Sequence, residues 1–267
     1  MFDGLGAVSG EAGPPPWERT ATGCRGASMG SAIRMKVQWM LMAVALGAAA
    51  SAAAAPASGA PARSATGIRL NAPWKVKLYA LARDHFHHPA WGWQHSERDY
   101  RLAVRIARDD HLTVDKDALF AAAFLHDMAA FDPCADRKME HGACAALLSP
   151  AILKRIGFPM RKIAIVQQAE RGHMYYSNPG RNPTAIVLHD ADSLDFLGAI
   201  GAARMIALTG AKAGSFAPAI KTLRTFLTVI PPRLITPSAR RIGRRRVAQL
   251  TAFLTALQRQ TYDGRAL

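Results

Sequence analysis

Cysteine is scarce in this chain, which has only Cys24, Cys134 and Cys144 among its 267 residues. No two of them form a CxxC pair, so a zinc-ribbon fold is excluded. Cys134 and Cys144 could form a disulfide in an oxidising compartment, which would staple the loop that follows residue 131. Alternatively, Cys144, within AlaCysAlaAla, is an ordinary buried thiol, and both interpretations stay open at this point.

Several enzyme motifs are also missing. The chain has no Gly-rich phosphate loop, no GxSxG elbow and no HExxH helix. Catalysis by a nucleophilic serine therefore has no support, and there is no internal repeat that would indicate a solenoid.

Acidic residues are few compared with basic ones, 19 against 34, which gives a formal net charge of +15. Such an excess suits an anionic partner: a phosphorylated small molecule, nucleic acid or an anionic membrane surface. A basic protein without a polyanionic partner fits the same count. In the densest basic run, residues 240–246, no aromatic residues interleave, so we interpret it as a solvated helix face and favour nucleic acid less.

The first 55 residues do not resemble a folded domain. Residues 1–34 lack apolar periodicity, and we expect them to be a misassigned or disordered extension, with translation starting at Met35 or Met29. Residues 35–55 combine Lys36, a short apolar run and small residues, the pattern of a signal peptide. The runner-up is an uncleaved anchor, but the run is short for a membrane span. We expect a periplasmic or secreted protein without a stable membrane anchor, and residues 56–70 as a linker.

From Trp74 onward the apolar pattern is helical. Trp74, Leu78 and Leu81 share one helix face. Asp115 is a good N-cap for a helix over 116–130. Further helices are expected over 94–109, over 139–155 with an interruption at Pro150, over 160–172 and 184–208, and over 217–229 and 238–260. The sequence therefore predicts an all-α fold, one domain of six to eight helices over residues 71–262. It does not indicate the oligomeric state.

The adjacent pair His126–Asp127 lies within an alanine-rich, apolar segment. Burying a carboxylate beside an imidazole is costly unless a partner compensates, and a divalent metal ion is the best candidate. His95 and Asp192 could supply further ligands from neighbouring helices. His141 and His173 could complete a second metal position or contact a substrate phosphate. Imidazoles with carboxylates suit Mn, Fe, Co, Ni or Zn better than an ion held by oxygen alone, and one or two ions could bind.

The order of these residues resembles the HD-domain metal-dependent phosphohydrolase superfamily, which has a separated His, a His-Asp pair and a late Asp. Here they match His95, His126–Asp127 and Asp192. The segment AspAlaAspSerLeuAspPheLeuGlyAla (190–199) is similar to that of bacterial HD proteins that hydrolyse nucleotides. The resemblance spans about residues 75–260. It implies an HD-type helical domain and a first metal, Mg also being allowed, held by His95, His126, Asp127 and Asp192.

Neighbouring residues receive supporting roles in this interpretation. We prefer Asp192 to Asp190 as ligand, with Asp190 or Asp195 orienting a ligating imidazole. Arg98, one turn after His95, is a candidate phosphate clamp, as are Arg137 and Lys138, and a surface salt bridge is the alternative for Arg98. Glu170 stands where the resemblance leads us to expect an apolar residue, which weakens the assignment of His173.

The predicted function is a metal-dependent phosphohydrolase in which Asp127 and Arg98 serve catalysis. Its substrate would be a nucleotide-like or other small phosphorylated molecule, attacked by a metal-activated water. Two alternatives remain: a di-iron oxygenase on the same scaffold, and a non-catalytic module that binds a metal or an anion. His85, His87 and His88, near Trp91 and Trp93, are interpreted as an access loop packed by aromatic residues rather than a further metal site.

Overall fold

The computed structural model describes residues 62–131 and 139–267, except the side chains of 209–213. These ranges contain nine α-helices and no strand, apart from one isolated bridge between Arg63 and Arg69, which confirms the all-α prediction. The helices are α2 (Pro73–His85), α3 (Trp93–Asp109), α4 (Lys116–Leu125), α5 (His141–Ile156), α6 (Ile163–Gly172), α7 (Pro183–Asp195), α8 (Gly198–Ala213), α9 (Ala217–Val229) and α10 (Pro237–Gln260). Three single-turn 3-10 helices join them: η1 (Met128–Ala130), η2 (Met160–Lys162) and η3 (Pro231–Arg233).

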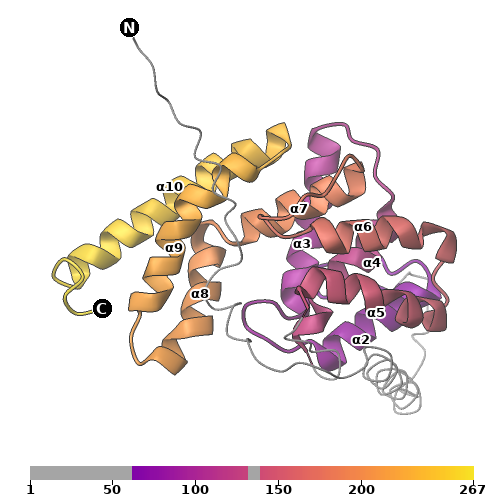
Figure 1. Ribbon diagram of the computed structural model, residues 1–267, viewed down its shortest axis with the longest axis horizontal. Helices are drawn as coiled ribbons and strands as arrows, with labels where there is room; N and C mark the ends of the chain where they lie inside the picture. The colour runs from indigo at the N-terminus through magenta and orange to yellow at the C-terminus, as the bar shows by residue number, and fades with distance from the viewer. Residues whose placement is uncertain (1–61, 132–138) are drawn as a thin grey trace, which may run out of the picture.

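The helices form two groups (Figure 1). Helices α2 to α7 surround a core in which α3 packs on α4 and α7, and α6 packs on α4, α5 and α7. Helices α8, α9 and α10 pack on one another beside this core, and α10 also contacts α3 and α7. The predicted leader and Cys134, Arg137 and Lys138 lie outside the described residues, so the signal peptide and the Cys134–Cys144 pair remain predictions.

Helix starts largely follow the expected capping chemistry. The Asp115 carboxylate accepts hydrogen bonds from the backbone N–H groups of Asp117 and Ala118, as an N-cap residue does. Helices α2, α7, α9 and α10 each have a proline in their first turn, where a missing N–H costs nothing. Of the expected helices, 217–229 and 238–260 match α9 and α10 almost residue for residue.

Three expectations about helix boundaries are wrong. The helix expected over 116–130 ends at Leu125, so His126 and Asp127 stand at its C-terminal end, before η1. The apolar run 184–208 is two helices, because the chain leaves the helical path at Leu197, whose φ and ψ are −111° and 159°. This division raises the helix count above the six to eight expected.

The third concerns Pro150, which does not interrupt α5. A proline has no N–H for the carbonyl four residues earlier, here that of Ala146. The side chain of Gln167 on α6 donates to that carbonyl instead, at 2.6 Å. A neighbouring helix thus satisfies the acceptor that proline leaves open, and α5 continues to Ile156.

The core of the first group is built from apolar side chains and aromatic rings that meet edge to face. Trp74 contacts Phe120 and Phe158 in this way, at centroid distances of 5.8 and 5.0 Å, and Tyr79 contacts Phe124 at 5.8 Å. This packing holds α2 against α4. None of the helices in the described ranges has the length and apolar content that a bilayer crossing requires.

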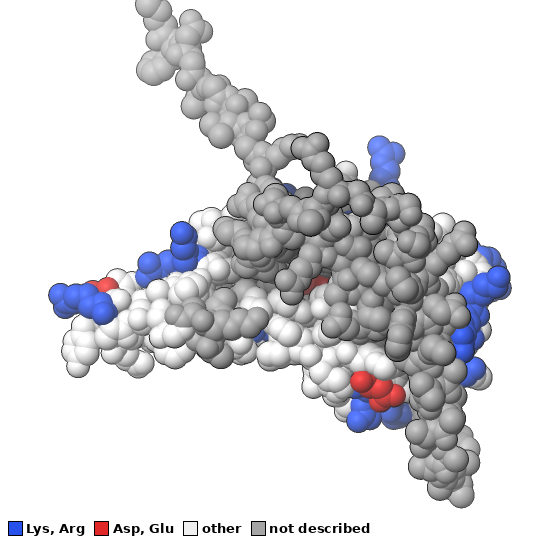
Figure 2. Space-filling model, turned by 60° about the horizontal axis from the view of Figure 1, so that its bottom comes forward, with Lys and Arg blue, Asp and Glu red and all other residues white. Residues whose placement is uncertain are grey.

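Figure 2 shows the basic side chains on one face of the molecule, where they lie at several places around the periphery with few acidic residues among them. In the basic run of α10, Arg240, Arg241, Arg244 and Arg245 are exposed. Arg246 instead donates to the backbone carbonyl of Leu194, at 2.6 Å. Most of the run is therefore a solvated helix face, as the sequence indicated.

Candidate metal centre

The six predicted ligands come from five helices, or from residues that directly follow them. His95 lies in the first turns of α3, and Asp192 in the last turns of α7. His126 and Asp127 follow α4, His141 begins α5, and His173 follows α6. Since α3, α4, α6 and α7 pack on one another, all six side chains meet in the interior of the first helix group.

Four of them form a first cluster around the ring nitrogen Nε2 of His95. This atom lies 3.3 Å from His126 Nε2, 3.4 Å from Asp127 Oδ2 and 3.2 Å from Asp192 Oδ1. The His95, His126 and Asp192 side chains are almost completely buried. The spatial convergence expected of His95, His126, Asp127 and Asp192 is present in the structure.

The other carboxylate oxygen of Asp127 faces a second cluster. Asp127 Oδ1 lies 3.6 Å from His141 Nε2 and 3.7 Å from His173 Nε2, and these two nitrogens are 3.1 Å apart. Asp127 therefore stands between two groups of ring nitrogens, with one oxygen toward each. Asp127 and His141 expose 15% and 22% of their side chains, so solvent reaches the centre from their side.

The four imidazoles share one orientation toward the centre, with Nδ1 on an oxygen acceptor and Nε2 facing inward. His126 Nδ1 lies 3.0 Å from the carbonyl of Ala123, and His173 Nδ1 lies 2.6 Å from that of Glu170. The acceptors for His95 and His141 are the carboxylates of Asp195, at 2.8 Å, and Glu140, at 3.3 Å. Such outer acceptors fix the tautomer with a proton on Nδ1 and leave Nε2 as a lone-pair donor.

This donor set fits a cation. Lone pairs of ring nitrogens and carboxylate oxygens face one another at 3.1 to 3.7 Å, an arrangement that repels unless protons or metal ions lie between them. Asp192 Oδ2 is buried and has no hydrogen-bond partner. Two groups of residues place their ligand atoms within 4.8 Å of one another: His95, Asp99, His126 and Asp192, and His126, Asp127 and His173.

The pKa values of His126 and His173 reflect the close approach of these ionisable groups. Burial opposes the imidazolium form of His126, but the adjacent carboxylate of Asp127 outweighs burial and raises the pKa of His126 to about 9. Burial lowers the pKa of His173 to about 4, and the positive charges of His126 and His141 add to this effect. His126 thus holds a proton at neutral pH in the metal-free protein, and a metal ion would displace it.

Asp195 contacts His95 at Nδ1, the ring nitrogen that faces away from the centre. Besides holding His95 Nδ1, its Oδ2 accepts hydrogen bonds from Arg98 Nη2 at 2.8 Å and from Arg204 Nη1 at 3.1 Å. Burial would raise the pKa of Asp195, but the charges of Arg204, His95 and Arg98 hold it well below its usual range. The orienting role expected of Asp190 or Asp195 belongs to Asp195.

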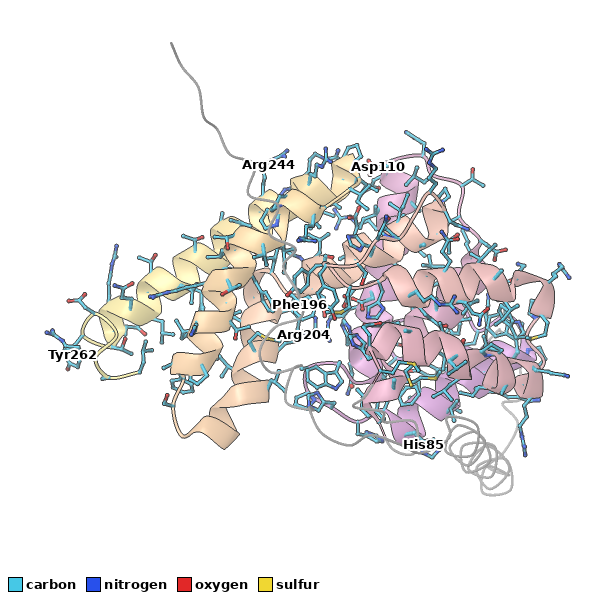
Figure 3. All side chains as sticks on the ribbon, in the orientation of Figure 1. His85, Asp110, Phe196, Arg204, Arg244 and Tyr262 are labelled. Atoms are coloured by element: carbon cyan, nitrogen blue, oxygen red, sulfur yellow. The ribbon has the colours of Figure 1, made fainter. Side chains whose placement is uncertain are left out.

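Arg98 therefore forms a partly buried ion pair with Asp195, and its expected contact with a substrate phosphate remains a prediction. Arg204, which the sequence reading did not single out, is almost fully buried where α8 follows α7 (Figure 3). It stacks on the Phe196 ring at 4.4 Å and donates to the carbonyl of Ala90. Its Nη2 lies 3.4 Å from His95 Nε2, so a cation already borders the first cluster.

Two residues that the sequence placed near the site have other roles. The Asp190 carboxylate accepts from the backbone N–H groups of Ile235 and Thr236, both at 2.8 Å, and so fixes the start of α10. Glu170 is buried, and its Oε2 accepts a hydrogen bond from Ser149 at 2.7 Å. Burial raises the pKa of Glu170 to about 8. Its backbone carbonyl orients His173, so its presence does not displace that imidazole.

Asp99 belongs to the first cluster and was missed in the sequence. Its Oδ2 lies 3.0 Å from His95 Nε2 and 3.7 Å from His126 Nε2. The signal was available, because Asp99 follows His95 by four positions and such residues share one helix face.

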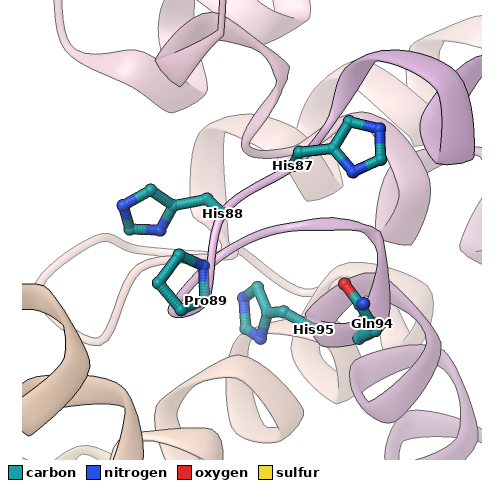
Figure 4. A pocket seen from close by; sticks show the side chains of 5 residues that line it. All are labelled: His87, His88, Pro89, Gln94 and His95. Carbon is teal, nitrogen blue, oxygen red and sulfur yellow. The ribbon is translucent and has the colours of Figure 1, made fainter.

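A pocket of about 360 Å³ opens next to His95, lined by His87, His88, Pro89, Gln94 and His95 (Figure 4). His88 stacks on Trp91 with ring centroids 4.0 Å apart. The geometry agrees with an access loop packed by an aromatic residue, although His85, at the end of α2, does not line the pocket.

A family model described as "HD domain" matches residues 92–197, a span that contains all six predicted ligands, and confirms the resemblance. No curated protein sequence matches the chain. Solved structures with a similar fold include Bacillus subtilis YpgQ in complex with ADP, at 19% identity and a TM-score of 0.54, covering 70% of this chain and 97% of that one.

Two further structures support the same fold. A Lactobacillus plantarum protein matches at 21% identity and a TM-score of 0.55, covering 70% of this chain and 96% of its own. A predicted HD superfamily hydrolase from an uncultured Thermotogales bacterium matches at 23% identity and a TM-score of 0.52, with coverage of 70% and 93%.

Proposed function

We propose that this chain, whose residues 92–197 match the HD-domain family model, is a metal-dependent phosphohydrolase. Its substrate would be a nucleotide-like or other small phosphorylated molecule. One observation carries the proposal: four imidazole Nε2 atoms and the carboxylates of Asp127 and Asp192 face one another in a largely buried site, with each Nδ1 held by an oxygen.

The two carboxylate oxygens of Asp127 face different clusters, so the centre could bind one or two divalent ions. His95, His126 and Asp192 would hold the first with Asp127, and His141 and His173 would hold the second through the other oxygen of Asp127. When bound, such ions supply a water of lowered pKa and positive charge beside a phosphate. The mixture of nitrogen and oxygen ligands favours Mn, Fe, Co, Ni or Zn, with Mg also allowed.

Residues of the protein would orient the metal ligands and balance their charge. Asp195 keeps His95 aimed at the centre, and Arg98 and Arg204 balance the charge of Asp195. A substrate would approach from the solvent-accessible side, where Asp127 and His141 are partly exposed. The Arg204 guanidinium, whose Nη2 lies 3.4 Å from His95 Nε2, would add a fixed positive charge at the inner side of the centre.

A nucleotide-like substrate is supported by charge and by comparison. The formal net charge of +15 favours a polyanionic ligand. YpgQ, which has the same fold, was crystallised with ADP. We also propose that the protein acts in the periplasm or outside the cell, on the basis of the signal-like residues 35–55. Mass spectrometry of the protein exported from a bacterial host tests this, and a mature chain that still contains residues 35–55 would contradict it.

The test of function combines metal analysis with turnover. The purified protein is stripped with a chelator, reloaded with each divalent metal, and assayed for phosphate release from nucleoside mono-, di- and triphosphates and sugar phosphates. We expect metal-dependent release by the wild type and none above background by Asp127→Ala, which loses a ligand to both clusters. Asp109→Asn, a partly exposed site at the other end of α3 that pairs with Arg105 and Arg108, is the matched control and should keep wild-type turnover.

The same samples separate the alternatives. Two irons per chain with oxygen consumption and no phosphate release would indicate the di-iron oxygenase. Tight metal binding without turnover of any substrate would indicate the non-catalytic module. Equal turnover by the wild type and Asp127→Ala would overturn the phosphohydrolase, because no ion could then depend on the carboxylate shared by both clusters.

A further inference from the structure

The Asp99 carboxylate is more deeply buried than Asp127 and His141, the two partly exposed residues of the metal centre. Its side chain is fully shielded from solvent, and neither of its oxygens has a hydrogen-bond partner. An unpaired buried carboxylate costs several kcal/mol unless a charge compensates it. The nitrogens nearest to it belong to the imidazoles of His95, one turn earlier on α3, and of His126, which follows α4.

Hydrogen bonding to the neighbouring imidazoles does not supply that partner. His95 Nε2 lies 3.0 Å from Asp99 Oδ2 but without hydrogen-bond geometry. The same nitrogen is also 3.2 Å from Asp192 Oδ1 and 3.4 Å from Asp127 Oδ2. One N–H can serve only one of three carboxylates well, so the other oxygens around this atom need a different positive charge.

Arginine does not supply it either. Arg98, the residue before Asp99, turns to Asp195, and Arg204 binds Asp195 and the carbonyl of Ala90. The charge of Arg246, on α10, also acts on Asp99, but this guanidinium donates to the backbone carbonyl of Leu194 at 2.6 Å. The ligand atoms of the first cluster lie closer, with His95 Nε2 at 3.0 Å and His126 Nε2 at 3.7 Å from Asp99 Oδ2. The Asp99 carboxylate lies with His95, His126 and Asp192 in one group whose ligand atoms are all within 4.8 Å of one another.

We propose that Asp99 is a further ligand of the first metal ion, supplied by α3 one turn after His95. The inference rests on the proposed metal centre and extends it. The first ion then has two imidazoles, His95 and His126, and three carboxylates, Asp99, Asp127 and Asp192. This oxygen-rich set selects Mn²⁺ or Fe²⁺ over Zn²⁺, since Zn²⁺ prefers four ligands with nitrogen or sulfur among them. It also leaves one position fewer for solvent.

The test measures binding of Mn²⁺ and Zn²⁺ alone by the metal-stripped protein, in competition with a fluorescent chelator. The variants are Asp99→Asn, which keeps the shape of the side chain, and Asp99→Ala, in case the amide is not tolerated. Asp109→Asn on the same helix is the control. We expect both Asp99 variants to bind Mn²⁺ about 10- to 100-fold more weakly, the range seen when even a supporting residue of a metal site is lost. Zn²⁺ affinity should fall less.

A second measurement separates ligation from a structural role. At saturating Mn²⁺, water-proton relaxation should be faster in Asp99→Asn than in the wild type, because solvent takes the vacated position. Wild-type Mn²⁺ affinity and relaxation in both folded Asp99 variants would overturn the inference and leave the proposed function intact. A wild-type protein that binds neither metal would overturn both.

Discussion

At the scale of single residues, the side chain that holds His95 in place is the carboxylate of Asp195. It accepts hydrogen bonds from His95 Nδ1 and from the guanidinium groups of Arg98 and Arg204. An imidazole held in this way presents Nε2 to a metal without losing rotational entropy on binding. Arg98 and Arg204 thus act on the centre through Asp195.

The first prediction concerns this support. Asp195→Asn replaces a charged acceptor by a neutral amide, of which only the oxygen can accept hydrogen bonds from His95 and the two arginines. His95 is therefore held less firmly. We expect the dissociation constant for Mn²⁺ to rise about 10- to 100-fold, measured by chelator competition on protein whose helix content is checked by circular dichroism. Asp109→Asn should bind as the wild type does. A folded Asp195→Asn protein with unchanged affinity would show that His95 needs no such support.

At the scale of helices, α5 and α6 depend on each other around Pro150. The Ala146 carbonyl, which proline cannot serve, takes its hydrogen bond from Gln167. Because His141 begins α5 and His173 follows α6, this contact joins the two elements that carry the second cluster. The rule that proline ends a helix does not hold here, because a side chain from a neighbouring helix supplies the missing hydrogen bond.

The second prediction is a double-mutant cycle at this contact. Gln167→Ala should lower the free energy of unfolding by about 1–3 kcal/mol, the cost of leaving a buried carbonyl unpaired. In a Pro150→Ala background the restored N–H can serve Ala146, so the same substitution should cost clearly less. Urea unfolding of the four proteins gives the coupling. An equal cost in both backgrounds would refute the role assigned to Gln167.

Charged side chains join α2, α4 and η2 in a similar way. Asp117, in the first turn of α4, pairs with Lys75 of α2 at 2.8 Å and with Lys162 of η2 at 2.7 Å. Partial burial tends to raise the pKa of Asp117, but the two ammonium groups outweigh it and lower that pKa. The unfolded chain therefore binds this proton more readily, and the pair stabilises the fold only while Asp117 is ionised.

The third prediction follows from that sign. Asp117→Asn should lower stability by about 1 kcal/mol at pH 6, a modest figure because Asp117 is 34% exposed and solvent screens the pair. The difference between wild type and variant should shrink as the pH falls below about 4, where the unfolded chain becomes protonated. Urea unfolding at pH 3 and 6 measures it, with the exposed Asp84→Asn as control. A pH-independent difference would rule out the ion pairs as its source.

How far the sequence predicts the molecule depends on the range of the interactions involved. The ligands His95, His126, Asp127 and Asp192 could be named because their order along the chain is distinctive, and Asp115 because capping is local. Asp99 could have been named from its spacing of four residues after His95, which places both on one helix face. Arg204 could not, since only the packing of α8 against the centre distinguishes it from a surface charge. The continuation of α5 through Pro150 likewise depends on a contact between helices, the hydrogen bond from Gln167 to the Ala146 carbonyl.

At the scale of the whole molecule, the metal centre collects side chains from α3 and α7 and from residues at the ends of α4, α5 and α6. The centre therefore joins five of the six helices of the first group, α3 to α7. An ion that binds only the folded chain must stabilise it. Metal binding and folding are therefore coupled across the whole domain.

The fourth prediction measures this coupling. An ion present at 100 times its dissociation constant contributes about 2.7 kcal/mol, which raises the Tm of a domain of this size by about 5–10 °C. We expect Mn²⁺ to produce that rise in the metal-stripped protein and excess EDTA to reverse it. Asp127→Ala should show almost no rise, because it removes a ligand from both clusters, whereas Asp109→Asn should respond fully. If Asp127→Ala were stabilised as much as the wild type, the ion would be bound elsewhere on the protein.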